Sequence, residues 1–126
     1  MKCARTPIIF FILLLSCHIA YSFEGSIKVS AADARGTVII GADDQKEYVT
    51  TPPVPPSAPY LNMYILEKEG NLHKLIRQND EELSYFIFID YKTQNKNKTM
   101  SVNGNFDDIP KDYSIILIDN GKEHNL

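Results

Sequence analysis

The chain has 126 residues, of which 13 are Lys or Arg and 16 are Asp or Glu, giving a net charge of −3. This length suits one small domain. An acidic chain without a basic stripe is a poor candidate for nucleic-acid binding, because that affinity comes largely from neutralised phosphates. The same charge argues against electrostatic attachment to anionic lipid.

The N-terminus has the three parts of a secretory signal peptide. Lys2 and Arg5 form a short positive region, residues 8–15 are an unbroken apolar run, and Ala20 and Ser22 are the small residues of a cleavage site after Ser22. The run is too short for a membrane-spanning helix, which needs about 20 residues. The alternative is a buried N-terminal helix of a cytosolic protein, but core helices show a 3.6-residue apolar period. We predict that residues 1–22 are a cleaved signal peptide and that the mature protein is secreted or periplasmic.

A second interpretation of this segment ends at Cys17. The sequence Leu14-Leu15-Ser16-Cys17 resembles the lipobox of bacterial lipoproteins, in which the cysteine is lipidated and becomes the first mature residue. Leu15 departs from that pattern, where Ala, Ser or Thr is commoner. If Cys17 is lipidated, residues 1–16 are the signal and the protein is anchored to the outer membrane. Otherwise Cys17 is an apolar filler that leaves with the signal, and the sequence leaves both interpretations open.

The predicted mature chain differs in charge and chemistry from the whole. Loss of residues 1–22 removes two of the basic residues and none of the acidic ones, so 11 face 16 and the net charge is −5. Both cysteines, Cys3 and Cys17, lie within the signal, so no disulfide is expected although the compartment would permit one. Small animal secreted modules often rely on disulfides, and their absence favours a bacterial envelope protein.

The first part of the predicted mature chain has short β-branched segments separated by Ala, Asp and Gly. Residues 23–51 offer three strand-like pieces, at 26–30, 37–41 and 46–51, or else act as a linker. Residues 52–59 hold five prolines, which favour an extended connector in the polyproline II conformation. The alternative is a ligand for a Pro-binding domain, but the usual domains of that kind are cytosolic.

Residues 60–126 are predicted to be the main β domain. Strands are expected at 60–68 and 72–78, around a turn at Glu69-Gly70-Asn71, and at 83–91, which is apolar on both faces and should be a central strand covered above and below. Further strands are expected at 99–103 and 113–118, with a stub after residue 122. One short helix is allowed between residues 72 and 84. The sequence therefore predicts an all-β protein, mainly a small antiparallel β-sandwich.

Catalytic and metal-binding residues are scarce. Only His73 and His124 remain after the signal, and two scattered histidines are a weak basis for zinc. The chain has no Gly-x-Ser-x-Gly context for a serine nucleophile, and the mature part has no cysteine to act as one. We predict a protein that is not an enzyme, with no catalytic, cofactor-binding or metal-binding residues.

Acidic residues offer two further candidate sites, and both are incomplete. Three carboxylate pairs could in principle support glycoside hydrolysis, but that chemistry needs an aromatic-lined cleft and the chain has no tryptophan: Asp43-Asp44, Glu81-Glu82 and Asp107-Asp108. Residues 103–107 place oxygen ligands at alternate positions, as a calcium loop does. The sixth position should be Gly but is Asp108, and the twelfth should be Glu but is Ser114. Solvated loop acids explain these residues more simply.

One modification motif remains. Asn97-Lys98-Thr99 is a sequon for N-glycosylation in a polar loop, and it matters only in a eukaryotic source. In that case the protein would be a secreted glycoprotein ligand carrying its glycan on Asn97.

A short segment after the prolines is similar to a known family. Pro59-Tyr60-Leu61-Asn62-Met63-Tyr64-Ile65-Leu66, behind a leader and a linker, resembles the small outer-membrane lipoprotein of type VI secretion systems. The resemblance covers about ten residues and implies a transthyretin-like β-sandwich whose first strand follows a proline; the Arg usual in that strand is absent here. Among the function classes, we favour an exported binding or structural module of the cell envelope or extracellular space that contacts another protein. A membrane is expected as a partner only through the signal or a lipid on Cys17.

Overall fold

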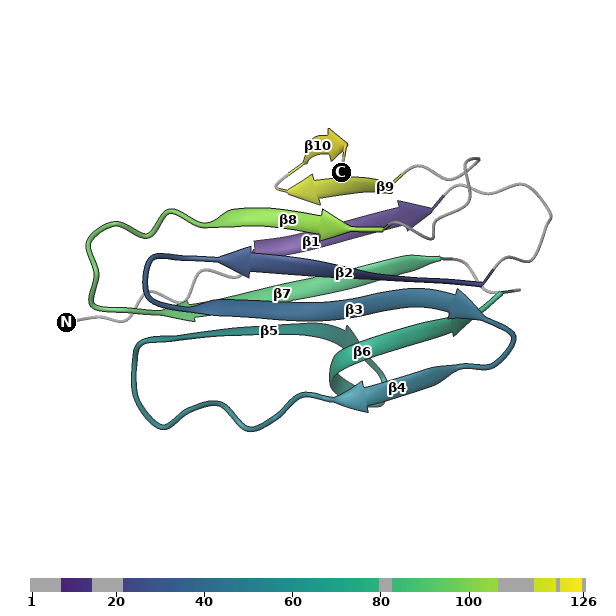
Figure 1. The fold of residues 1–126 in the computed structure, drawn as a ribbon, viewed down its shortest axis with the longest axis horizontal. Helices are drawn as coiled ribbons and strands as arrows, with labels where there is room; N and C mark the ends of the chain where they lie inside the picture. Colours follow the sequence, from purple (N-terminus) through teal and green to yellow (C-terminus); the bar gives the residue numbers. More distant parts are fainter. Residues whose placement is uncertain (1–7, 15–21, 80–82, 107–114, 120, 126) are drawn as a thin grey trace.

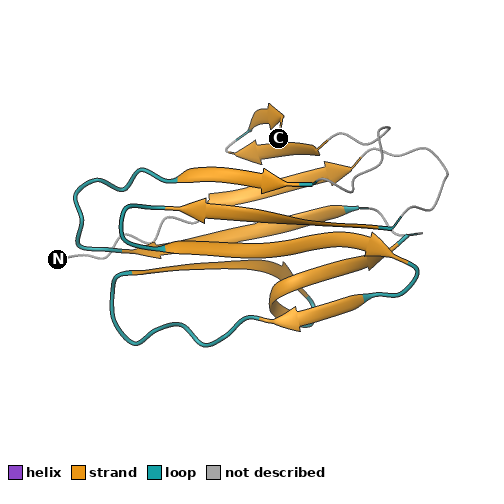
Figure 2. Ribbon diagram, in the orientation of Figure 1, coloured by secondary structure: helices purple, strands orange, loops and turns teal. Residues whose placement is uncertain are grey.

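The computed structural model describes residues 8–14, 22–79, 83–106, 115–119 and 121–125, and Figure 1 draws the other residues as a grey trace. The described residues form ten β-strands and contain no helix (Figure 2), so the protein is all-β, as the sequence predicts. The strands join into one sheet in the order β10-β9-β1-β7-β5-β6-β3-β2-β8, and β4 pairs with β6 beside this path.

The N-terminal part contributes four strands, which are β1 (Ile8–Leu14), β2 (Phe23–Ser30), β3 (Arg35–Asp43) and β4 (Glu47–Thr50). The three strands predicted between residues 23 and 51 are confirmed. β2 and β3 form a hairpin whose turn is closed by a hydrogen bond from the Ala31 amide to the Ala34 carbonyl, 2.8 Å long. Residues 8–14 form an extended strand, and not the helix of the cytosolic alternative.

Six further strands follow, which are β5 (Tyr60–Glu67), β6 (Gly70–Gln78), β7 (Ser84–Lys92), β8 (Ser101–Asn105), β9 (Ile115–Asp119) and β10 (Lys122–Asn125). The β5–β6 turn lies one residue earlier than predicted, because Gly70 already pairs with Glu67. Gly70 has a φ of 119°, which side-chain-bearing residues rarely adopt.

The short helix that the sequence allows between residues 72 and 84 is wrong over residues 72–78. These residues lie in β6, where Leu72 and Leu75 are fully buried. Strand pairing on both edges of β6 outweighs the helical spacing of its leucines. Residues 80–82, which complete that predicted helix, lie outside the described residues.

Strand β6 makes the sheet curl. Its first residues pair with β5, while residues 74–78 pair with β3 in the one parallel contact of the described sheet. β4 pairs along the other edge of β6. β6 thus pairs with β5 at its start and with β3 at its end. As a result, β2 and β3 lie across the core from β5 and β7 (Figure 1).

The core lies inside this curl. It takes side chains from both halves of the sheet, which are Phe23, Ile27, Val29, Val38, Ile40, Ala42, Leu61, Met63, Ile65, Leu72, Leu75, Leu83, Tyr85, Ile87, Ile89 and Tyr91. Each large apolar side chain that is fully buried contributes about 1.5–3 kcal/mol. The proline segment 52–59 connects β4 to β5 outside the strands, and strands from both sides of it share this core.

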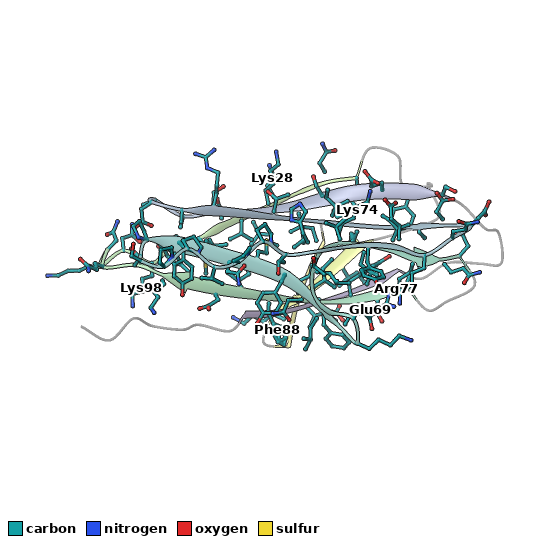
Figure 3. The ribbon with its side chains drawn as sticks, turned by 90° about the horizontal axis from the view of Figure 1, so that it is seen from below. Lys28, Glu69, Lys74, Arg77, Phe88 and Lys98 are labelled. Carbon is teal, nitrogen blue, oxygen red and sulfur yellow. The ribbon has the colours of Figure 1, made fainter. Side chains whose placement is uncertain are left out.

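β7 is a central strand between β1 and β5, as the sequence predicts. The prediction that it is covered on both faces is wrong. Tyr85, Ile87, Ile89 and Tyr91 are buried, while Phe86 is 45% exposed on the other face. Apolar residues on both faces of a strand therefore do not always mean two covered faces, and Figure 3 shows Phe88 on the outer side of the sheet, opposite Lys28.

Candidate functional site

The segment predicted to be the apolar part of the signal peptide occupies a place inside the sheet. β1 pairs antiparallel with β7 through six residue pairs, from Ile8 opposite Ile89 to Leu13 opposite Ser84. On its other edge β1 pairs antiparallel with β9 through five residue pairs, from Phe10 opposite Asp119 to Leu14 opposite Ile115. Residues 8–14 therefore complete the backbone hydrogen bonding of two neighbouring strands.

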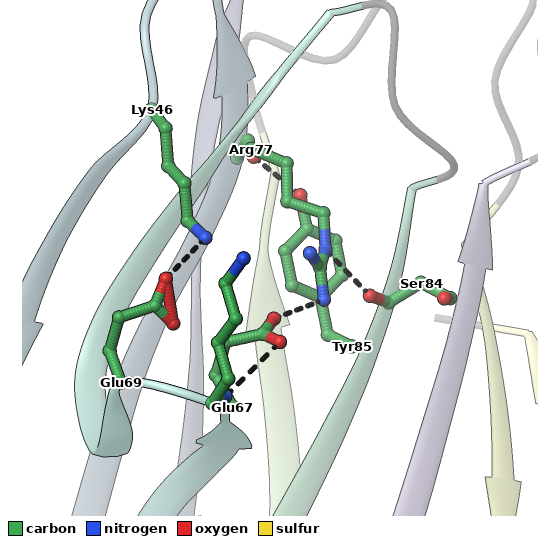
Figure 4. A network of polar contacts seen from close by, with 8 residues as sticks. Lys46, Glu67, Glu69, Arg77, Ser84 and Tyr85 are labelled. Atoms are coloured by element: carbon green, nitrogen blue, oxygen red, sulfur yellow. Dashed lines mark hydrogen bonds and ion pairs between the residues drawn. The ribbon is translucent and has the colours of Figure 1, made fainter.

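A polar network lies where β5, β6 and β7 meet (Figure 4). The Arg77 guanidinium donates to the Glu67 carboxylate at 2.6 Å and to the Ser84 carbonyl at 2.9 Å, and it lies 5.4 Å from the centre of the Tyr85 ring. The Arg77 and Glu67 side chains are 15% and 19% exposed. Arg77 therefore ties three strands together with charge-assisted hydrogen bonds.

The second ion pair of this network joins the loop before β4 to the β5–β6 turn. The Lys46 ammonium lies 2.5 Å from a carboxylate oxygen of Glu69, and this hydrogen bond is the main reason why the pKa of Glu69 is lowered. The other carboxylate oxygen of Glu69 is buried, and none of the described residues gives it a hydrogen bond. Since each charge in the network faces an opposite charge, the cluster is built to hold strands in place.

Asp33, in the β2–β3 turn, accepts side-chain hydrogen bonds from Tyr91 at the end of β7 and from Thr93 just beyond it. The Thr93 hydroxyl donates to it at 2.5 Å and the Tyr91 hydroxyl donates to its other carboxylate oxygen. These two bonds, that from Thr93 first, lower the pKa of Asp33, and the bond to Asp33 raises the pKa of Tyr91. The cluster fastens the turn to the end of β7 and favours the ionised form of the Asp33 carboxyl.

β4 is an exposed edge strand. All four of its residues are exposed, and Tyr48 and Val49 are large apolar residues with exposed fractions of 48% and 46%. Lys74 of β6 lies 3.3 Å from Glu47 of β4 and 3.4 Å from Glu24 of β2, contacts that contribute little because both carboxylates are largely in solvent. β4 thus presents apolar side chains at a sheet edge.

His73 lines a shallow hollow of about 290 Å³ between the proline segment and residues of β3, β5 and β6. Its other lining residues include Pro52, Pro53, Thr51 and Met63. His73 is half-buried in β6, and none of the described residues that line this hollow is a carboxylate. Within the described part of the chain, no three His, Cys, Asp or Glu residues gather as metal ligands.

Of the residues predicted for cleavage, lipidation or glycosylation, Ser22 and Asn97 lie in the described part of the chain and Cys17 does not. The Ser22 hydroxyl donates to Asp43 at 2.8 Å, and Ser22 is exposed directly before β2. Asn97 is exposed in the loop between β7 and β8, where its side-chain oxygen accepts a hydrogen bond from the Thr99 amide at 3.1 Å. Cys17 lies outside the described residues. His124 lies in β10, with only its backbone described.

The first three residues of the candidate calcium loop, 103–105, form part of a strand and not a metal-binding loop. Asn103 and Asn105 lie in β8, paired with Lys28 and Ser26 of β2, and a strand cannot wrap its oxygen atoms around one ion. The remaining candidates, Glu81-Glu82 and Asp107-Asp108, lie outside the described residues. Asp43 is exposed at the end of β3, and its pKa is lowered by hydrogen bonds from the Asp44 amide and then from Ser22.

Sequence reasoning missed Arg77, Glu67 and Asp33, because their contacts join different strands and turns, which spacing along the chain does not reveal. In the described residues no helix is long and apolar enough to cross a membrane.

Comparisons of the chain with protein-family models, with curated proteins and with solved structures found no match.

Proposed function

We propose that the protein is exported and acts as a small non-catalytic binding protein of the cell envelope or extracellular space, through contacts with another protein. The observation that carries this proposal is the exposed edge strand β4, with Tyr48 and Val49 nearly half exposed. A sheet edge offers unpaired backbone groups to an incoming strand, and exposed aromatic residues are favoured at protein interfaces. The rigid core behind β4 presents this edge in a fixed shape, and we describe the curled sheet as a small β-sandwich.

The polar clusters support this proposal and not catalysis. Arg77 forms an ion pair with Glu67, and Glu69 forms one with Lys46. The Asp33 carboxylate accepts hydrogen bonds from two hydroxyl groups. A general acid or base needs a proton that a substrate can reach. These groups instead hold neighbouring strands together.

Photo-crosslinking in the native host tests the proposal. A photoreactive residue replaces Tyr48 at the edge, and in a matched control it replaces Lys28, which is exposed on the outer face of β2. We expect the Tyr48 position to form a discrete adduct with an envelope or extracellular protein and the Lys28 position to form none. Absence of an adduct at Tyr48, or equal adducts at both positions, would contradict the proposal.

A lipid anchor is a second candidate, carried by the Leu-Leu-Ser-Cys sequence at residues 14–17. Lipidated Cys17 would make the protein an outer-membrane lipoprotein, in line with its resemblance to the type VI secretion lipoprotein. Metabolic labelling with a fatty acid, with Cys17→Ser as the control, decides between anchored and soluble forms. In a eukaryotic source, the exposed Asn97 would instead carry a glycan, and glycosidase treatment would lower the mass of the native protein.

A further inference from the structure

β1, the strand formed by the predicted leader, links the β9–β10 hairpin to the rest of the described sheet. In the described sheet, β9 pairs with β1 and β10 only, so the β9–β10 hairpin is joined to the other strands through β1. β7 likewise has β1 as its partner on one edge and β5 on the other. Cleavage after Ser22 removes the strand that links β7 to β9.

The slot left by β1 is apolar and two-edged. β7 supplies Tyr85, Ile87 and Ile89, which belong to the buried core and lie opposite β1 residues in the register. β9 supplies an Ile-Ile-Leu-Ile run before Asp119. An open edge of such strands has backbone N–H and C=O groups ready to pair with another strand.

We propose that, after the leader is cleaved, an extended apolar segment of a partner protein takes the place of β1, antiparallel to β7 and β9. This inference rests on the proposed function, because it needs the leader to be removed. The leader segment Ile-Ile-Phe-Phe-Ile-Leu-Leu defines the chemistry of the occupant, which is about seven residues of β-branched, aromatic or leucine side chains.

The geometry favours a single free strand over a second copy of the folded domain. The occupant must pair on both edges, once with β7 and once with β9. β7 of a second copy already has β5 on one edge, so only its other edge is available. It could pair with β7 of the first copy, but β9 of the first copy would then be left without a partner. An extended segment has both edges available.

The test uses the full chain with a protease site inserted between Ser22 and Phe23. After cleavage, native mass spectrometry measures whether the leader fragment stays bound. A labelled peptide Ile-Ile-Phe-Phe-Ile-Leu-Leu, flanked by lysines for solubility, is then added in excess, and a peptide with Pro in place of its second Phe is the matched peptide control. The matched protein control carries its protease site in the exposed loop at residues 94–98, so that its leader stays attached.

We expect the labelled peptide to exchange into the chain cleaved after Ser22 at least about tenfold more than into the control protein, because a tethered leader competes at high effective concentration. The Pro peptide should not enter, since it lacks a ladder N–H. The inference also holds if the cleaved chain precipitates on its own but stays soluble when the peptide is added. It is overturned if the cleaved chain stays folded as a monomer or becomes a dimer without taking up the peptide, or if it precipitates with the peptide present.

This inference and the proposed function fail in different ways. If native protein begins at Met1, the export proposal fails whatever the cleaved chain binds in vitro. If native protein begins at Phe23 and the cleaved chain refuses the peptide, export stands and the strand-replacement inference fails.

Discussion

The hydroxyl of Tyr85 on β7 donates a hydrogen bond to the carbonyl oxygen of Gly41 on β3, across the core of the curled sheet. Tyr85 is fully buried, so this bond is shielded from water. It joins two strands that are separated by β5 and β6 in the order of the sheet. The bond therefore helps to fix how far the sheet curls.

Replacing Tyr85 with Phe should lower the free energy of unfolding by about 1–3 kcal/mol, because the Gly41 carbonyl would lose a buried donor. Urea denaturation monitored by circular dichroism measures the change. Tyr48→Phe, on the exposed edge strand, is the matched control and should leave stability unchanged. Equal midpoints for the two variants would show that the Tyr85–Gly41 bond contributes nothing.

Gly41 and Gly25 both lie where an added Cβ atom would clash, against backbone at Gly41 and mainly against an aromatic ring at Gly25. A Cβ atom at Gly41 would lie 2.2 Å from the Phe23 carbonyl oxygen, which belongs to the backbone of the paired strand. One at Gly25 would lie 2.1 Å from the Phe106 ring and 2.9 Å from the Asn105 carbonyl oxygen, so the ring makes the tighter contact. Both Ala variants should be less stable than the natural protein. We expect Phe106→Ala to recover part of the stability of Gly25→Ala and none of that of Gly41→Ala. Thermal unfolding of the two glycine variants, of each combined with Phe106→Ala, and of Phe106→Ala alone checks this. Equal recovery at both sites would contradict the packing described.

Arg77→Lys should destabilise the protein by about 1–3 kcal/mol, because one ammonium cannot bond Glu67 and the Ser84 carbonyl in the fork geometry of a guanidinium. Lys92→Gln is the control, since the one contact of the Lys92 ammonium with the described residues is a long one, 5.9 Å from the centre of the Tyr60 ring. Denaturant midpoints report the difference. If Arg77→Lys unfolds like the natural protein, the network of Figure 4 does not hold the strands.

Acid should weaken the protein through Asp33. Because Thr93 and then Tyr91 lower the pKa of Asp33, its contribution is complete above the ordinary carboxyl pKa and is lost as the pH falls below about 4. Thr93→Val should flatten the fall in urea midpoint between about pH 5 and pH 3, and Thr50→Val, exposed on β4, should not. The same acid slope in all three proteins would refute this role for Asp33.

The strands that the sequence predicts well are those with local patterns. β2, β3, β5 and β7 stand near their predicted places, because alternating apolar residues and turn residues specify them locally. The parallel pairing of β3 with β6 and the Tyr85–Gly41 bond join residues far apart in the chain, so no local pattern predicts them. β6 shows the limit, because leucines spaced as in a helix there fill a strand in the core.

The same limit applies to the candidate site. The block of apolar residues at 8–15 predicts a leader by composition, whereas its pairing with β7 and β9 depends on three-dimensional neighbours. The ion pairs of Arg77 and Glu69 could not be read from spacing, because their partners come from different strands or loops.

The N-terminal residue of the native protein, isolated from its host and determined by mass spectrometry, tests export most directly. We expect the protein to begin at Phe23, or at a lipidated Cys17, and to fractionate with the envelope or the extracellular medium. A native protein that begins at Met1 and fractionates with cytosol would contradict export, and β1 would then be a permanent strand of the sheet.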